Sequence, residues 1–234
     1  MSMAFVHGAG RGGRQAWPRQ LDLATSSLSE AVWLDWQDEA EPSGSLGGDL
    51  VGLQVDALLA CADKPVDVVA HSQGAVAALL AAQDPAQPVR SMVLFEPACF
   101  SLARGLPAVE EHIAVMDPVV AGARSDPQVD DIEYARRFFA ALGAPMPPAE
   151  TVEQVRAFRR LRTVPAPWAA RIDSAVLSRV PTLVITGGWL PLYEQTADAL
   201  KDAGARHEVL EGHGHRPQDH PEANAVICDF HASL

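Results

Sequence analysis

Ser72 lies where a reversal of the chain would expose a reactive hydroxyl. A mostly β-branched run at residues 66–70 precedes it, and an alanine-rich, helix-like stretch at residues 75–82 follows it. A serine between a buried strand and a helix is the setting of a nucleophile elbow, a strained turn that needs small residues on either side. Such a serine can attack a carbonyl carbon and form a covalent acyl intermediate.

A serine nucleophile needs a general base, and histidine is suited because its pKa lies near neutrality. Three of the eight histidines, His213, His215 and His220, share one loop after the last predicted strand. With Asp219 they could also suggest a metal site, but no second cluster with ligand spacing occurs. We therefore expect no metal and no other cofactor. His71 adjoins the serine, but its side chain should leave the turn in another direction, so we interpret it as a packing residue.

The third group would be a carboxylate that accepts a hydrogen bond from the histidine, as Glu96 or Glu194 could. Glu96 ends the strand predicted at residues 89–95, and Glu194 lies on the first turn of a predicted helix. A carboxylate at the carboxyl end of a parallel strand faces the ligand site, which favours Glu96. The helix dipole alone explains an acidic residue at position 194. A serine–histidine pair without an acid stays open.

The elements that position these residues are short apolar runs, which alternate with helical patterns along the chain. The alternation predicts an α/β fold with a mostly parallel sheet and helices on both faces. Pro221 can open the final helix, because proline suits the first helical position. The predicted helices outside the central segment are residues 48–61, 75–82, 193–203 and the segment after 221. The predicted strands are residues 3–6, 31–36, 66–70, 89–95, 182–186 and 207–210.

The alternation stops between the fourth and fifth strands, in residues 101–177. Helices are predicted at residues 131–142 and 152–162, and Thr151 and Gln154 have capping-box spacing. An all-helical insertion at one strand end indicates a cap over a site. We therefore divide the chain into a core of residues 1–100 and 178–234 and a helical cap of residues 101–177.

The predicted cap carries half of the chain's 18 basic residues. Some of these arginines could attract an anionic substrate group, but solvated helix faces that balance a very acidic body are the preferred interpretation. The arginines are Arg104, Arg124, Arg136, Arg137, Arg156, Arg159, Arg160, Arg162 and Arg171.

Composition limits the partners and the compartment. The formal net charge of -12 argues against nucleic-acid binding, which needs clustered lysines and arginines. The three cysteines, Cys61, Cys99 and Cys228, form no disulfide framework or zinc pattern, which favours free thiols in a reducing compartment. No apolar run approaches the roughly 20 residues of a membrane helix, and residues 1–10 do not resemble a signal peptide. We expect a cytoplasmic protein with a small-molecule substrate and no membrane partner; a homodimer stays open.

Three motifs together resemble the α/β-hydrolase superfamily over nearly the whole chain. HGAG at residues 7–10 is similar to the loop after the first central strand, AHSQG at residues 70–74 to the elbow, and GHGHRPQDHPE at residues 212–222 to the histidine loop. Ala70 departs from the usual pattern, which has glycine there. The resemblance implies an α/β-hydrolase fold of about six strands, without the family's two outermost N-terminal strands.

The resemblance also assigns roles. It implies that the backbone N–H groups of Ala9 and Gln73 form an oxyanion hole and that His215 is the base. Leu190 stands where most members carry an aspartate. The chain resembles a subset that pairs Glu-Pro after the fourth strand with Gly-Gly lacking that aspartate, which favours Glu96 over Glu194 as the acid.

We therefore expect a cofactor-free serine hydrolase, most similar to carboxylesterases, that acts on a small and fairly apolar ester or acyl substrate. The same triad can also support C–C bond hydrolysis, a lyase reaction or perhydrolysis. A binding or signalling protein that kept the fold without turnover is the third hypothesis, and Leu190 is its main support.

Overall fold

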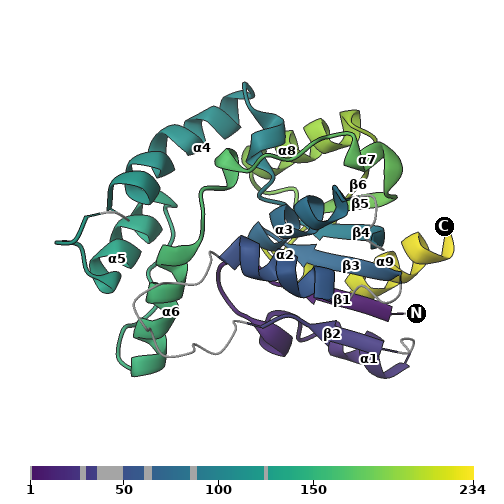
Figure 1. Cartoon of the computed structure of the whole chain (residues 1–234), viewed down its shortest axis with the longest axis horizontal. Coiled ribbons are helices and arrows are strands. Elements are labelled where there is room, and N and C mark those ends of the chain that lie inside the picture. Colours follow the sequence, from purple (N-terminus) through teal and green to yellow (C-terminus); the bar gives the residue numbers. More distant parts are fainter. Residues whose placement is uncertain (1, 27–29, 36–49, 61–64, 85–88, 124–125) are drawn as a thin grey trace.

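The computed structural model describes residues 2–26, 30–35, 50–60, 65–84, 89–123 and 126–234. All six predicted strands occur, and they form one parallel sheet in the order β2-β1-β3-β4-β5-β6 (Figure 1). The expected fold class is thereby confirmed. The strands are β1 (Ser2–Val6), β2 (Glu30–Trp33), β3 (Val66–His71), β4 (Val89–Phe95), β5 (Thr182–Thr186) and β6 (Arg206–Val209).

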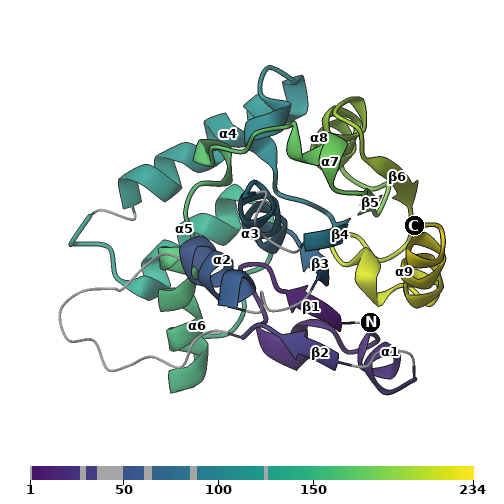
Figure 2. The same ribbon diagram turned by 45° about the vertical axis from the view of Figure 1, so that its right-hand side comes forward.

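Helices cover both faces of the sheet because its central strands are apolar on both sides. Every residue of β3 is buried. One face packs against α2 (Leu50–Ala60), α3 (Gln73–Ala82), α7 (Val176–Arg179) and α8 (Pro191–Asp202). The other face packs against η1 (Gly13–Ala16), α1 (Leu21–Ser26) and α9 (Ala223–Ala232), and Figure 2 shows α1 and α9 on that side.

Strand register brings the ends of β3, β4 and β5 to one edge. His71 pairs with Phe95, and Phe95 pairs with Ile185. The residues that follow these strand ends therefore begin three neighbouring loops at the carboxyl edge of the sheet. Parallel α/β sheets place their ligand sites at this edge.

The regular elements between β4 and β5 in the described part of the chain are all helical, and turns and irregular stretches join them. This segment lies beyond the carboxyl ends of the strands (Figure 1). The capping box that begins α6 is present: Thr151 Oγ1 accepts from Gln154 N–H over 3.2 Å, and Gln154 Oε1 accepts from Thr151 N–H over 2.9 Å. Its elements are η2 (Phe100–Ala103), α4 (Pro107–Asp117), the π-helical turn η3 (Pro118–Ala123), α5 (Asp131–Ala141), α6 (Val152–Thr163) and η4 (Pro167–Ala169).

A small apolar cluster joins this segment to the core. Val129, Tyr134 and Leu161 are buried together, and Ala9 from the loop after β1 packs against them. Several arginines of the segment form ion pairs on exposed helix faces, such as Arg137 with Glu133 over 2.8 Å in α5. Pairs of this kind contribute little to stability.

A few predicted boundaries were wrong. The last helix begins at Ala223 rather than at Pro221, because the chain first makes a turn in which the Ala223 N–H donates to His220 O over 3.1 Å. β2 ends at Trp33; Trp36 lies outside the described residues, as do Cys61, Arg124 and the predicted helix start at residues 48–49. The helix α4 lay within the predicted cap but was not located from the sequence.

Candidate active site

Ser72 lies on a tight turn between β3 and α3. Its backbone angles are φ 53° and ψ -119°, and its N–H donates to Phe95 O over 2.9 Å. Gly74 makes the turn sterically feasible, because a Cβ there would lie 2.5 Å from the backbone oxygen of Val6 and 2.6 Å from that of His7. Only glycine allows β1 and α3 to approach this closely.

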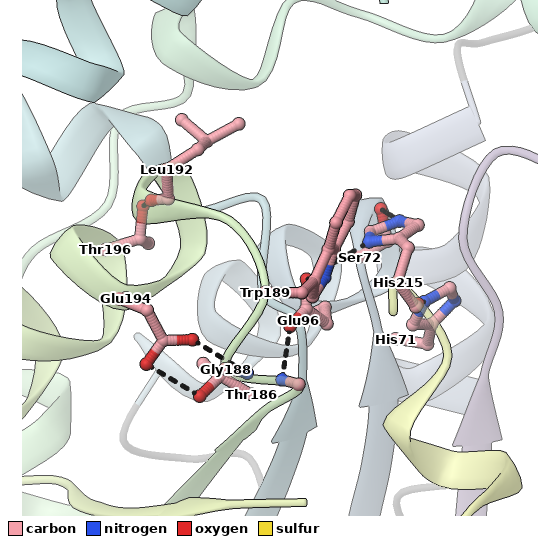
Figure 3. Close-up of polar contacts among 11 residues, drawn as sticks. His71, Ser72, Glu96, Thr186, Gly188, Trp189, Leu192, Glu194, Thr196 and His215 are labelled. Carbon is pink, nitrogen blue, oxygen red and sulfur yellow. Dashed lines mark hydrogen bonds and ion pairs between the residues drawn. The ribbon is translucent and has the colours of Figure 1, made fainter. Parts of the chain in front are cut away.

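Ser72, His215 and Glu96 lie in one line of contacts (Figure 3). The Oγ of Ser72 is 3.2 Å from Nε2 of His215, and Nδ1 of His215 is 3.4 Å from Oε2 of Glu96. This pattern requires the Nδ1–H tautomer, in which Nε2 accepts from the serine hydroxyl. Both distances are long for hydrogen bonds, as is common in free enzymes before a substrate tightens them.

Backbone strain marks two of these three residues, Ser72 and Glu96. Among the described residues other than glycine, only Ser72 and Glu96 have positive φ, at 53° and 42°. Such conformations cost about 1–3 kcal/mol each and cluster at functional sites. Each residue follows a strand end, and the Glu96 N–H extends the ladder by donating to Ile185 O over 2.8 Å.

Glu96 is completely buried, and hydrogen bonds hold both of its carboxylate oxygens. Oε1 accepts from the Gly187 N–H over 2.6 Å, and Oε2 accepts from the indole N–H of Trp189 over 3.2 Å. A carboxylate in this setting can accept the Nδ1–H of His215 and stabilise an imidazolium.

Glu194 lies on the first turn of α8, as predicted, but its carboxylate contacts other groups (Figure 3). It accepts from Thr186 Oγ1 over 3.0 Å and from Gly188 N–H over 3.2 Å. His207 Nε2 lies 3.8 Å away from the same carboxylate. The structure thus brings Glu96, and not Glu194, to His215.

Two rings pack against His215. The ring centroid of His71 is 4.8 Å away, and Tyr193 stacks at 4.9 Å with an interplanar angle of 29°. Burial, followed by the nearby charge of His215, holds the pKa of His71 well below its usual range. Burial, with a smaller contribution from the charge of Glu96, raises the pKa of the Tyr193 hydroxyl. Both neighbours therefore stay neutral.

The HGAG loop passes beside the nucleophile. A Cβ at Gly8 would lie 3.0 Å from Cβ of Ser72, so the backbone of Ala9 begins next to the serine. His7 is buried and its Nδ1 lies 2.6 Å from Gly8 O, and burial lowers its pKa. On the other side, Gln73 is the first residue of α3, whose first N–H groups have no partner within the helix.

The other polar residues of the histidine loop are engaged elsewhere. Nδ1 of His220 accepts from Glu222 N–H over 3.1 Å, and Asp219 pairs with Arg216 over 2.6 Å. Within the described ranges, no group of three or more His, Cys, Asp or Glu side chains could hold a metal ion. Of the described helices, none is long and apolar enough to span a membrane.

The sequence of residues 3–225 matches the sequence model of the alpha/beta hydrolase family. The chain belongs to the alpha/beta hydrolase family. No curated protein matches it. Solved structures with the same fold are similar over nearly their whole length, at low identity.

NosK from Streptomyces actuosus superposes with a TM-score of 0.63 at 19% identity, covering 99% of this chain and 97% of its own. MenH from S. aureus gives a TM-score of 0.59 at 17% identity, covering 100% and 94%. A structure from work on carboxylesterases of the thaumarchaeon Nitrososphaera gargenis gives a TM-score of 0.61 at 16% identity, and the match covers 99% of this chain and 90% of that one. At these identities the similarity shows the fold alone.

Two aromatic residues of this hydrolase-family site were missed in the sequence. Trp189 and Tyr193 flank Leu190, the position where the resemblance placed an acid. Their location after β5 could have identified them, because the turn after this strand borders the site in this fold. Their chemistry gave no reason to select them, since neither residue type is needed in a serine–histidine–carboxylate triad.

Proposed function

We propose that this protein is a serine hydrolase that cleaves small carboxylic esters through an acyl-enzyme on Ser72. The observation that carries the proposal is the contact line from Ser72 Oγ through His215 to Glu96, at 3.2 and 3.4 Å. Membership of the alpha/beta hydrolase family supports the hydrolytic class.

In the acylation step, Ser72 Oγ attacks the ester carbonyl carbon while its proton passes to Nε2 of His215. The tetrahedral intermediate then collapses, the C–O bond to the alcohol breaks, and the imidazolium returns the proton to the departing oxygen. Glu96 accepts the Nδ1–H throughout. The alcohol leaves and the acyl group remains on Ser72.

Water completes the cycle by the same route. His215 Nε2 removes a proton from the water as its oxygen attacks the acyl carbon, and the proton then returns to Ser72 Oγ as the acid leaves. In both steps the backbone N–H groups of Ala9 and Gln73 would stabilise the oxyanion, a contribution of several kcal/mol in such sites. Their positions on either side of Ser72 support this assignment.

The aromatic surroundings favour a small apolar acyl group. Tyr193 stacks on His215, and its ring centroid lies 6.1 Å from that of Phe100. His112 packs edge-on against Phe100, with 5.0 Å between their ring centroids. Burial lowers the pKa of His112, so this wall carries no charge at neutral pH. The helical segment of residues 101–177 would act as the cap that bears part of the wall. The free thiols of Cys99 and Cys228 suit a reducing cytoplasm.

Ser72→Ala tests the proposal with p-nitrophenyl acetate and a fluorophosphonate probe. Wild type should turn over the ester and be labelled, whereas Ser72→Ala should do neither. His215→Ala should lose turnover, and His213→Ala, in the same loop, should retain it. Full activity of Ser72→Ala would refute the assignment. β-Diketones, cyanohydrins and peroxide with a carboxylic acid, assayed alongside, separate ester hydrolysis from the other reactions of such a triad.

A further inference from the structure

The turn after β5, residues 187–189, supplies hydrogen-bond donors where the family's usual acid is missing. Leu190 occupies the acid's position, yet two N–H groups of the turn reach Glu96 from across the sheet edge. The Gly187 N–H donates to Oε1, and the Trp189 indole N–H donates to Oε2, the oxygen nearest His215. The acid therefore lies in the loop after β4, and the loop after β5 supplies its hydrogen-bond donors.

Glu96 needs such donors because its carboxylate is fully buried. A buried carboxylate without partners takes up a proton, since burial disfavours the charged form. In the described part of the chain, its ion-pair partner is His215 at 3.4 Å, and no lysine or arginine pairs with it. Burial and, to a smaller extent, the charge of Glu96 raise the pKa of the Tyr193 hydroxyl, so this neighbour stays neutral. Neutral N–H donors must therefore stabilise the anion.

Trp189 combines this hydrogen bond with a position at the protein surface. Its side chain is 49% exposed, although its N–H contacts a carboxylate that is 0% exposed. Figure 3 shows the indole beside Glu96 and His215. Its ring centroid also lies 6.3 Å from that of Tyr193, which stacks on His215.

The turn that carries the indole is anchored independently of Glu96. Glu194 accepts the Gly188 N–H over 3.2 Å and is itself held by Thr186 Oγ1. A Cβ at Gly187 would lie 2.5 Å from the backbone oxygen of Gly214, so the turn also abuts the loop of His215. The indole is thus fixed relative to both Glu96 and the base.

We propose that Trp189 is a positioning residue, whose indole N–H holds the Glu96 carboxylate and directs its Oε2 toward Nδ1 of His215. The inference rests on the proposed function. Because the indole and His215 share one oxygen, loss of the indole N–H lets the carboxylate rotate away from the histidine. It also removes one of the two N–H donors that the turn after β5 supplies to the buried carboxylate.

Trp189→Phe keeps an aromatic ring and removes the donor. The kcat for p-nitrophenyl acetate should fall roughly tenfold or more, with KM within about twofold of wild type. Trp168→Phe is the matched control, since it removes an indole hydrogen bond to Asp117 rather than to Glu96 and should leave kcat within about twofold of wild type.

A double-mutant cycle tests whether Trp189 acts through Glu96. In a Glu96→Ala background, Trp189→Phe should cause no further loss of kcat. Equal losses in both backgrounds would overturn the inference.

The contact has a readout that needs no turnover. In ¹⁵N-labelled protein, the Trp189 indole resonance, assigned by its absence in Trp189→Phe, should shift in Glu96→Gln. An unmoved resonance would also overturn the inference. Failure of the proposed function appears separately, as wild-type protein without Ser72-dependent fluorophosphonate labelling, and the positioning role then falls with it.

Discussion

His71 donates the Nε2–H of its ring to the backbone oxygen of His215 over 2.8 Å, across 144 residues of sequence. The residue before the nucleophile thus holds the backbone of the proposed base. Burial lowers the pKa of His71 well below its usual value, so the ring remains a neutral donor at neutral pH. One hydrogen bond therefore links the elbow to the histidine loop and helps to set the 3.2 Å approach of Ser72 and His215.

His71→Leu should lower both stability and activity. The variant leaves the carbonyl of His215 without its partner, which costs about 1–3 kcal/mol of unfolding free energy, and kcat should fall roughly tenfold. His71→Gln, whose amide nitrogen can reach the same oxygen, should recover most of both. Urea unfolding and ester hydrolysis measure the two effects, and equal behaviour of Leu and Gln would argue against the hydrogen bond.

Substitution of the two candidate acids should have unequal effects. Glu96→Gln cannot stabilise the imidazolium, so kcat should fall on the order of 10³- to 10⁴-fold. Glu194→Gln keeps an acceptor for Gly188 and does not touch His215, so kcat should stay within roughly threefold of wild type. Steady-state kinetics on one ester distinguishes them; the reverse ranking would make Glu194 the acid.

Gly74→Ala should destabilise the fold at the elbow. The added Cβ would meet two backbone oxygens at 2.5 and 2.6 Å, which cannot move without displacing β1. We expect a loss of about 1–3 kcal/mol or more, measured by urea unfolding. Gly122→Ala is the control, because nothing lies within 4 Å of its added Cβ. A Gly74→Ala protein as stable as that control would contradict the close packing.

The protein should lose stability as the pH falls below about 6.5, the histidine pKa in unfolded chains. Burial lowers the folded-state pKa values of His7, His71, His112 and His231. Between these values and 6.5 the unfolded chain binds more protons, so acid favours unfolding, by at most about 1.4 kcal/mol per pH unit for each histidine. Above about pH 6.5 these histidines are neutral in both the folded and the unfolded chain, so they no longer make the free energy of unfolding depend on pH.

Urea unfolding between about pH 5 and 8 measures this effect. His71→Gln should give a shallower pH dependence than wild type, because one titrating group is removed. A free energy of unfolding that is constant over this range would contradict the prediction.

Local sequence was enough to predict the sheet and the turn that carries Ser72. The apolar run of β3 and the small residues around Ser72 predict the strand, the turn and the helix, because steric and hydrogen-bonding preferences act over a few residues. His215 was selected by the resemblance of its loop to the family's histidine loop. The structure places it 3.2 Å from Ser72.

The choice of carboxylate depended on the packed fold. Glu96 and Glu194 both have local reasons to be acidic, at a strand end and at a helix start. The strand-end position and the family resemblance favoured Glu96, but only the packed structure shows which carboxylate reaches His215. Glu96 meets His215 across 119 residues because β4 and β5 pair in register and bring their loops together. The contact of Trp189 with Glu96 arises in the same way. Packing sets the distances between segments far apart in the chain, and local composition does not determine them.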